Sequence, residues 1–133
     1  MALKQVFMLD TDAVRALVDR TSPQLDRWFA EDRCSLSAVV AAELRFGLAR
    51  RRLSPQRDQL VKDLLKAIPI QPFEQKAAES YGALRAQLLQ NGITLSAMDR
   101  LIAAHAIALN CTLLTADQAF SQVAALESRH WEA

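Results

Sequence analysis

Short apolar segments alternate with longer amphipathic ones along this chain, which predicts an α/β domain built on a parallel sheet. Strands of a parallel sheet are buried on both faces, so they read as brief apolar runs such as Val6–Leu9 and Leu113–Leu114. The chain has 133 residues, of which 51% are hydrophobic, and this is enough for one core. We therefore expect a single domain over residues 1–133, with four to five short strands flanked by helices.

Serines and prolines mark where the helices of the first half should begin. Ser22-Pro23 and Ser54-Pro55 each combine a capping residue with a proline suited to the first helical turn. Ser37 can cap the helix between them, and the helices before and after Ser54 should form a hairpin. The expected helices are 12–20, 22–31, Ser37 to about Arg52 and Ser54 to about Ala67, and the expected strands are Lys4–Leu9, Cys34–Leu36 and Ile68–Ile70.

The second half should contain two helices and two strands. Gln71-Pro72 turns the chain into a long amphipathic helix, and Asn91-Gly92 ends it because glycine accepts the left-handed conformation of a helix end. Ser96 can cap the helix that follows. The expected helices are Phe73–Gln90 and Ser96 to about Asn110, and the expected strands are Cys111–Thr115 in the centre of the sheet and Ser128–Trp131 at its edge.

The charge balance and the cysteines restrict the class of protein. The formal net charge is only +1, but Arg outnumbers Lys by twelve to four, so a basic surface would consist of guanidinium groups suited to phosphate. The first apolar run is too short, and too soon followed by Asp10, for a signal peptide or a membrane span. We expect a cytoplasmic protein that does not enter the membrane. Cys34 and Cys111 are far apart in the sequence and should be reduced, buried thiols.

Aspartates follow two of the expected strands. Asp10 and Asp12 come after the first strand, and Asp117 follows the strand that ends at Thr115. Ligands of open parallel sheets bind just outside the carboxyl ends of the strands, so these carboxylates should share a pocket. For each aspartate alone, a turn-forming or helix-capping role is the alternative.

Glu43 lies on an apolar stripe of an expected helix, where a carboxylate is unusual. Its neighbours three and four positions away are Val39, Val40, Phe46 and Gly47. Burying a carboxylate without a partner costs several kcal/mol or raises its pKa. An ion pair with Arg45 or Arg50 is the alternative, although neither arginine lies on the same helical face.

Asp99 stands at the start of a helix that should be buried. Ser96-Ala97-Met98-Asp99 matches a capping box with Asp in place of the usual Glu or Gln, so capping is one interpretation. Residues 101–109 are apolar on all sides of the helix, however, which places its amino end deep in the fold. A buried acid there needs a counter-ion, and one carboxylate oxygen can cap the helix while the other binds a metal.

Four of these five carboxylates, all except Asp12, together indicate a metal site. Acids gathered in a partly buried site must be protonated or share a cation, and oxygen-only ligands suit Mg²⁺ or Mn²⁺. His105 and His130 lack a histidine four positions away, so we interpret them as core or surface residues and not as zinc ligands. The proposed set is Asp10, Glu43, Asp99 and Asp117.

Four separated motifs carry a family resemblance. They are Phe7-Met8-Leu9-Asp10-Thr11-Asp12, Leu36-Ser37-Ala38 through Ala42-Glu43-Leu44-Arg45-Phe46-Gly47, Asp99 through Leu101-Ile102-Ala103-Ala104-His105-Ala106, and Leu114-Thr115-Ala116-Asp117. With these motifs in this order, the chain resembles PIN-domain toxins of the VapC type. The resemblance covers nearly the whole length. It implies a PIN-like three-layer α/β/α fold and a small bacterial ribonuclease that uses Mg²⁺ or Mn²⁺. By resemblance, the same four acids are both catalytic residues and metal ligands.

The sequence departs from the family pattern at two positions. Asp12 stands where the family commonly has asparagine, and Ala116 stands where asparagine often precedes the last aspartate. The first departure adds negative charge near the metal, and the second leaves Asp117 the least certain ligand. Thr11 and Thr115, with Asp12, are expected to surround the ligands and orient their carboxylates.

The resemblance also implies a substrate and partners. The chain should be the toxin of a type II toxin–antitoxin system, an endoribonuclease that hydrolyses RNA phosphodiester bonds in transfer RNA. A small antitoxin protein should bind it, and the toxin should form a homodimer within the toxin–antitoxin complex. Arginines are the expected contacts to the RNA backbone, namely Arg45, Arg50, Arg51 and Arg52.

Two other functions fit part of the sequence. Asp10-Thr11-Asp12-Ala13-Val14 matches the nucleophile motif of haloacid-dehalogenase-like phosphatases, in which Asp10 would attack phosphorus. That chemistry also needs a lysine after a strand-ending Ser or Thr, yet the last lysine is Lys76 and Glu43 would have no role. The third possibility is a catalytically idle PIN-like module that binds RNA or protein, which the intact acidic set argues against.

Overall fold

Five strands form one parallel sheet in the computed structural model, which describes residues 5–133. The strand order is β3-β2-β1-β4-β5, and every neighbouring pair runs parallel. The expected α/β class is thus confirmed. The strands are β1 Phe7–Leu9, β2 Cys34–Ser37, β3 Ile70–Gln71, β4 Thr112–Leu114 and β5 Ser128–Arg129.

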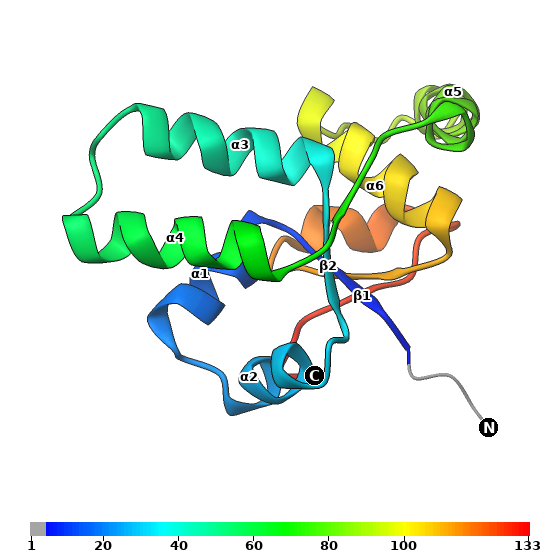
Figure 1. Cartoon of the computed structure of the whole chain (residues 1–133). Helices are drawn as coiled ribbons and strands as arrows, with labels where there is room; N and C mark the ends of the chain where they lie inside the picture. Colours follow the sequence, from blue (N-terminus) through cyan, green and yellow to red (C-terminus); the bar gives the residue numbers. More distant parts are fainter. Residues whose placement is uncertain (1–4) are drawn as a thin grey trace.

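Six α-helices within residues 5–133 flank the sheet (Figure 1). Ser22, Ser37, Ser54 and Ser96 each accept a hydrogen bond from a backbone N–H of the following helical turn, so the four predicted caps are confirmed. The helices are α1 Thr11–Asp19, α2 Pro23–Ala30, α3 Ala38–Ala49, α4 Pro55–Ala67, α5 Gln75–Gln90 and α6 Ala97–Leu109, with a 3₁₀ helix η1 over Gln118–Gln122.

Several element boundaries differ from the expected ones. Helix α3 ends at Ala49 and not near Arg52, because Arg51 adopts a left-handed conformation with φ 55°. The third strand is shifted toward the carboxyl end, since Ile68 is the buried C-cap residue that follows α4. The first strand was expected from Lys4, which lies outside the described residues. The short helix η1 was not expected.

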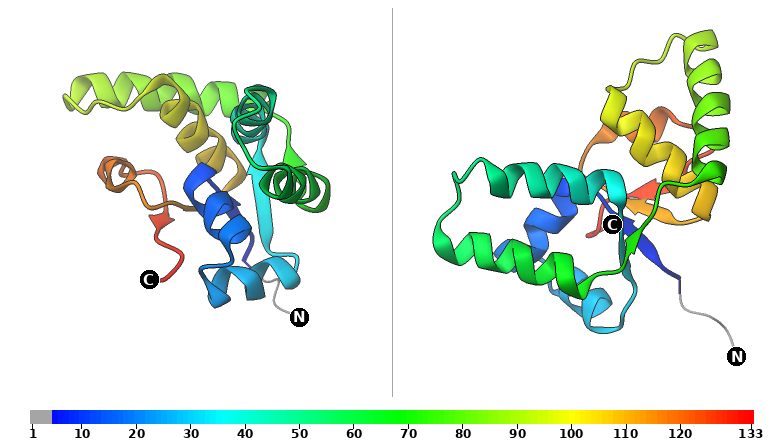
Figure 2. Two further views of the ribbon diagram at one scale, coloured as in Figure 1. Left: turned by 90° about the vertical axis from the view of Figure 1, so that its left-hand side faces the viewer. Right: turned by 45° about the horizontal axis from the view of Figure 1, so that its top comes forward.

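The core fills the space between the sheet and its helices. Strands β1 and β4 are fully buried, and Phe7 of β1 packs against Trp28 of α2 with ring centroids 4.3 Å apart. Helices α3 and α4 lie side by side as the expected hairpin, and α5 packs along α6 (Figures 1 and 2). Among residues 5–133, no helix is long and apolar enough to cross a membrane.

The strand order determines where a ligand site can form. From β1 the chain builds the sheet through β2 and β3 on one side, and then returns to add β4 and β5 on the other. The direction of winding therefore reverses between β1 and β4. Ligands of such sheets bind at the carboxyl ends of the strands at this switch point, and Asp10 directly follows β1 there.

Candidate active site

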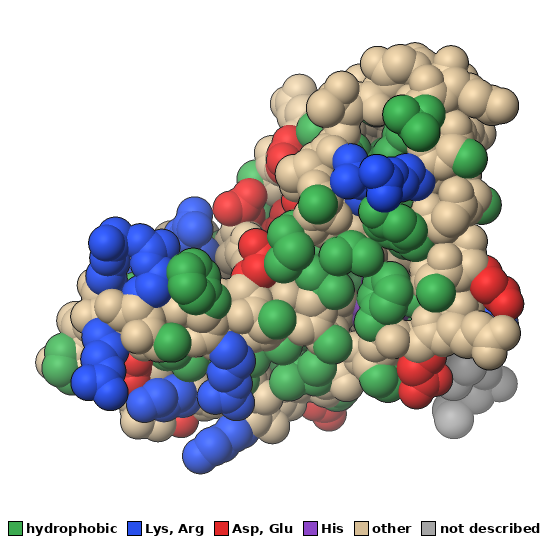
Figure 3. Space-filling view, turned by 90° about the horizontal axis from the view of Figure 1, so that it is seen from above, with side chains coloured by type: hydrophobic (Ala, Val, Ile, Leu, Met, Phe, Trp, Pro, Cys, Tyr) green, Lys and Arg blue, Asp and Glu red, His purple; other side chains and the backbone are tan. Residues whose placement is uncertain are grey.

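Carboxylates from four parts of the chain meet near the switch point. Asp10 and Asp12 follow β1, Asp117 follows β4, Glu43 lies on α3, and Asp99 lies in the first turn of α6. We call these five residues the acidic cluster. In Figure 3, acidic side chains gather between the basic end of the molecule and its other lobe.

Asp10 is the most firmly held member of the acidic cluster. Only 6% of the residue is exposed, and its Oδ1 accepts a hydrogen bond of 3.0 Å from the N–H of Ala13, which caps α1. Burial raises the pKa of Asp10 to about 6, although hydrogen bonds from the Thr115 side chain and the Ala13 backbone oppose the shift. The charge of Asp12 raises this pKa further. The side chain is therefore held in place, and burial disfavours its charged form.

Asp117 is held by the turn that follows β4. Its backbone N–H donates to Oγ1 of the buried Thr115 at 2.9 Å, and its own Oδ1 accepts from the N–H of Ala119 at 2.9 Å, capping η1. The capping alternative is thus realised for Asp117 as well as for Asp10. Asp117 is exposed, however, so one oxygen of its carboxylate can cap η1 while the other stays accessible to a ligand.

Glu43 is half-buried and faces another acid. Burial raises its pKa, and the negative charge of Asp99 raises it further. The alternative of an ion pair with an arginine is wrong for the part of the chain that the structure describes: Arg45 is exposed, and the Arg50 guanidinium lies over the ring of Phe46 at 5.5 Å. Among residues 5–133, Glu43 therefore has no cationic partner within ion-pair distance.

Asp99 connects the two sides of the acidic cluster. Its N–H donates to Oγ of Ser96 at 3.2 Å, which is the predicted cap of α6. Burial raises the pKa of the Asp99 carboxyl, the Ser96 side chain lowers it, and the charges of Asp117 and Asp12 raise it. Since Glu43 is in turn influenced by Asp99, these side chains lie within reach of each other's charge.

Asp12, the first departure from the family pattern, is partly neutralised by a neighbour. Nη1 of Arg15 lies 3.4 Å from Oδ1 of Asp12, one helical turn further along α1. The pair is exposed, so it screens the added charge without abolishing it. The pKa values of Asp10 and Asp99 are still raised by Asp12.

The donor chemistry of the acidic cluster fits a hard divalent cation. All its members are carboxylates. Burial and the charges of other members raise the pKa values of Asp10, Glu43 and Asp99. A bound cation would relieve this repulsion. Within residues 5–133, no group of three or more acidic, His or Cys side chains is placed so that it could hold a metal ion. Mg²⁺ does not require such a group, because it keeps several waters and is held through one or two carboxylates plus substrate phosphate.

A buried pair that sequence reasoning did not identify joins the two helices that carry Glu43 and Asp99. Oγ of Ser37, at the start of α3, lies 2.8 Å from Nδ1 of His105 in α6, and both residues are at most 1% exposed. The same Oγ accepts from the N–H of Val39, which leaves its hydroxyl proton for His105. His105 is thus a core residue as predicted, but its link to Ser37 spans 68 positions and has no local signal.

The predicted arginines lie at one end of the molecule. Arg45, Arg50, Arg51 and Arg52 are all exposed, at the end of α3 and in the connection to α4. Figure 3 shows basic side chains gathered over this end, next to the acidic ones. Two further arginines, Arg15 and Arg57, line a pocket together with Glu43 and were not identified from the sequence. Both cysteines are free, as expected, but only Cys34 is buried, whereas Cys111 is half-buried; burial raises the pKa of Cys34 to about 12.

Comparison with known proteins gives a consistent result. The model of the PIN domain family matches residues 7–126. Ribonuclease VapC2 of Rickettsia felis is 30% identical over 132 residues, which are 96% of this chain and 98% of that protein. The tRNA(fMet)-specific endonuclease VapC of Shigella flexneri is 23% identical over 94% of this chain and 97% of its own length.

A solved structure shares the fold. The crystal structure of VapBC2 from Rickettsia felis, bound to a DNA fragment from its promoter, contains a chain that matches with a TM-score of 0.84. The two chains are 27% identical, and the match covers 96% of this chain and 99% of the other.

The haloacid-dehalogenase alternative finds no support in the structure. Lys76 is exposed on α5 and lines a different pocket from the one that Thr115 lines.

Proposed function

We propose that this chain, which belongs to the PIN-domain family as a VapC-type ribonuclease toxin of toxin–antitoxin systems, cuts transfer RNA at the acidic cluster with Mg²⁺ or Mn²⁺. The observation that carries the proposal is the mutual repulsion of carboxylates at the switch point of the sheet. Burial and neighbouring charges raise the pKa values of Asp10, Glu43 and Asp99 together. Such an arrangement lowers the stability of the folded protein unless a cation binds to the carboxylates.

The residues of the acidic cluster would have different roles in binding the metal ion. A bound divalent ion supplies Lewis-acid chemistry, activating water and stabilising charge on the scissile phosphate. Asp10, held by Ala13 and Thr115, is the fixed ligand. Glu43 and Asp99 complete the ligand set from their helices, and Asp117 is a weaker, exposed member. Without the cation, the same charges repel a phosphate.

The proposed substrate class follows from the named relatives and from the shape of the site. Relatives from Shigella flexneri and Salmonella typhimurium are named tRNA(fMet)-specific endonucleases. The acidic cluster is open to solvent at Asp117, and single-stranded loops are the parts of an RNA whose unstacked bases a protein can reach. We therefore place the cut in a single-stranded loop of a transfer RNA.

Cleavage of a cellular RNA mixture tests this function directly. Purified protein is incubated with total RNA in Mg²⁺, in Mn²⁺ and in excess EDTA, and the new RNA ends are sequenced. We expect metal-dependent cuts in transfer RNA loops, their loss in Asp99→Asn, and their retention in Glu127→Gln, which neutralises an exposed carboxylate outside the cluster. Undiminished cutting in EDTA or by Asp99→Asn would overturn the acidic site, whereas metal-dependent cuts confined to messenger RNA would overturn only the substrate.

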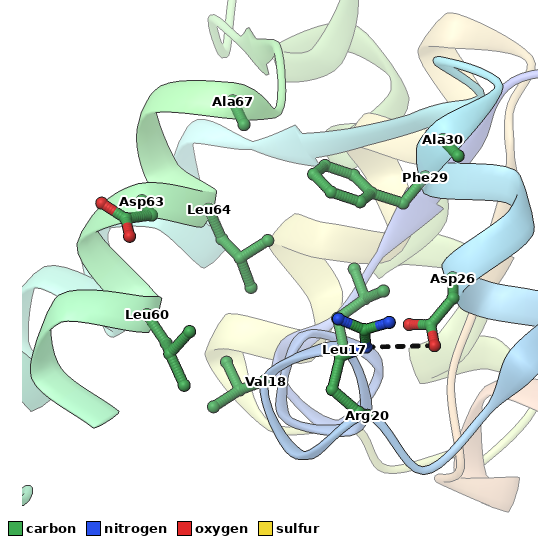
Figure 4. A pocket seen from close by; sticks show the side chains of 10 residues that line it. All are labelled: Leu17, Val18, Arg20, Asp26, Phe29, Ala30, Leu60, Asp63, Leu64 and Ala67. Carbon is green, nitrogen blue, oxygen red and sulfur yellow. Dashed lines mark hydrogen bonds and ion pairs between the residues drawn. The ribbon is translucent and has the colours of Figure 1, made fainter. Parts of the chain in front are cut away.

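The antitoxin has a suitable docking groove beside the helical hairpin. A groove of about 380 Å³ lies between α4 and the α1–α2 pair, where apolar side chains point toward one another (Figure 4). Arg20 and Asp26 form an ion pair of 3.2 Å at this groove. We propose that an apolar antitoxin helix occupies it, while a basic antitoxin side chain reaches the acidic cluster. The apolar lining includes Leu17, Val18, Phe29, Leu60 and Leu64.

Co-purification with the product of the neighbouring reading frame tests the partner. The complex should form and suppress RNA cleavage, and Leu64→Arg should weaken it because a charge would enter the apolar groove. Lys66→Glu, on the exposed side of the same helix, is the control. A complex unaffected by Leu64→Arg would place the antitoxin elsewhere. The proposed homodimer is tested separately by light scattering of the free toxin.

A further inference from the structure

A second pocket adjoins the acidic cluster on the side away from β4. It has a volume of about 310 Å³ and lies between α1, α3 and α4. Glu43 and Thr11 line it, so it is continuous with the acidic cluster. Its apolar wall comes from Val14, Val18, Leu53 and Val61. The pocket therefore combines an apolar surface with one residue of the acidic cluster, Glu43.

Gly47 keeps one wall of this pocket free of side chains. It lies inside α3, where glycine is less favourable than alanine because it loses more conformational freedom on folding. Its backbone does not require glycine, since it is not among the residues with positive φ. Beyond its own helical turn and chain neighbours, no atom lies within 4 Å of the position that a Cβ would take. Packing therefore gives no reason for glycine, and the open space in front of it is the pocket.

Two arginines supply positive charge at the same pocket. Nη1 of Arg15 contacts Asp12 on α1, and Nη1 of Arg57 contacts Asp19 across the α1–α4 boundary. Each pairing uses one nitrogen of a guanidinium that carries five N–H donors. Donors of both arginines thus remain for a phosphate, which a guanidinium can bind in bidentate fashion.

We infer that this pocket is a subsite for one nucleotide of the RNA strand next to the bond that is cut, with the phosphate bound by Arg15 and Arg57 and the base or ribose resting against the apolar wall beside Gly47. This inference rests on the proposed function, because it assumes that the scissile phosphate lies at the acidic cluster. Continuity through Glu43 and Thr11 places the next nucleotide of the same strand in the pocket. The side-chain-free wall at Gly47 gives that nucleotide its room.

Two helical glycines allow a matched test. Gly82 lies inside α5, also has no atom within 4 Å of an added Cβ, and does not line the pocket. Binding of a fluorescent ten-nucleotide single-stranded RNA is measured by anisotropy with Mg²⁺, in an Asp10→Asn background that leaves the RNA intact. Gly47→Leu should raise Kd about tenfold, and Gly82→Leu should not change it. Gly47→Ala and Gly82→Ala should both raise the melting temperature, but only Gly47→Ala should also weaken RNA binding.

The arginine contact is tested through its salt dependence. Arg57→Gln should reduce the slope of log Kd against log salt by about 0.7, the value for one phosphate contact to a single strand. Asp19→Asn breaks the same ion pair but keeps the guanidinium, so it should leave the slope unchanged. A merely structural role of the pair would affect both variants alike.

The outcomes separate this inference from the function on which it rests. Absence of RNA binding in the Asp10→Asn protein, together with absence of cleavage by the wild type, would overturn both proposals. RNA binding that is equal in Gly47→Leu and Gly82→Leu would overturn the subsite alone. If Gly47→Leu instead retained RNA binding but blocked association with the antitoxin, the pocket would serve the protein partner and the nucleotide subsite would also be overturned.

Discussion

The acidic cluster has two halves that are built differently. Asp10 follows a strand and is held by its own hydrogen bonds to Ala13 and Thr115, with 6% of the residue exposed. Glu43 and Asp99 lie on helices, are half-buried, and are positioned through the helices that carry them. The Ser37–His105 pair joins the start of α3, which carries Glu43, to α6, which carries Asp99.

This difference indicates a division between a fixed charge and adjustable ones. The cost of placing Asp10 is a loss of folding stability, because the charged form is disfavoured in the folded protein. Glu43 and Asp99 are more exposed than Asp10, so their side chains have more room to respond to a ligand. A site with one fixed and several adjustable carboxylates does not need a preformed group of three ligands, because Mg²⁺ is held through one or two carboxylates, several waters and substrate phosphate.

Neutralising the adjustable half should have the largest effect on activity. Glu43→Gln and Asp99→Asn should each reduce the RNA cleavage rate by about a thousandfold, since they remove charge that supports the divalent ion. Asp117→Asn should reduce it only about tenfold, because that residue is exposed. Single-turnover cleavage of a validated RNA measures the rates, with circular dichroism to confirm folding. Wild-type rates for both helix-borne variants would remove them from the active site.

The fixed half should reveal itself in the pH dependence of stability. Folding raises the pKa of Asp10 from 3.8 to about 6, so the folded state holds this proton more tightly than the unfolded chain. The stabilisation is complete below about pH 4 and is lost as the pH rises toward 6, at about 1.4 kcal/mol per pKa unit and about 3 kcal/mol in all. Asp10→Asn should therefore stabilise the protein at pH 7.5 and have little effect at pH 4.

Urea unfolding in EDTA at the two pH values measures this difference. Asp117→Asn is the control, since its carboxylate is exposed and its removal should give no comparable gain at pH 7.5. An equal gain from Asp10→Asn at both pH values would show that the effect is not caused by the charge. Adding Mg²⁺ should stabilise the wild type through linkage and narrow its gap to Asp10→Asn.

The same contrast explains what could be predicted from the sequence. Asp10, Glu43 and Asp99 were identified because each has a local signal: an acid after an apolar run, on an apolar stripe, or before a buried helix. The caps at Ser22, Ser54 and Ser96, also local, were predicted correctly. Contacts between distant segments were not predictable. Neither the Ser37–His105 pair nor the pocket that Arg57 shares with Glu43 leaves a pattern within a helical window.

The Ser37–His105 pair, which joins the helices of the helix-borne half, should contribute an intermediate amount of stability. Ser37→Ala leaves Nδ1 of the buried His105 without its hydrogen-bond donor, and His105→Phe leaves the hydroxyl proton of Ser37 without its acceptor, so each should cost about 1–3 kcal/mol. The double variant should cost less than the sum, because both single variants break the same bond. Urea unfolding of the four proteins gives the coupling energy, and Ser22→Ala, which removes a buried cap without such a partner, is the control. Additive effects would show that the two residues act independently.

The smallest expected effect comes from Asp12, which stands between the two halves. Its ion pair with Arg15 is exposed, so Asp12→Asn should change the free energy of unfolding by less than about 0.5 kcal/mol. Its charge nevertheless raises the pKa values of both Asp10 and Asp99, and removing it should lower both. Carboxyl carbon chemical shifts followed by NMR through a pH titration in EDTA measure the two values in one experiment. If only the Asp10 pKa fell, Asp12 would belong to the fixed half alone, and the two halves would be electrostatically separate at this position.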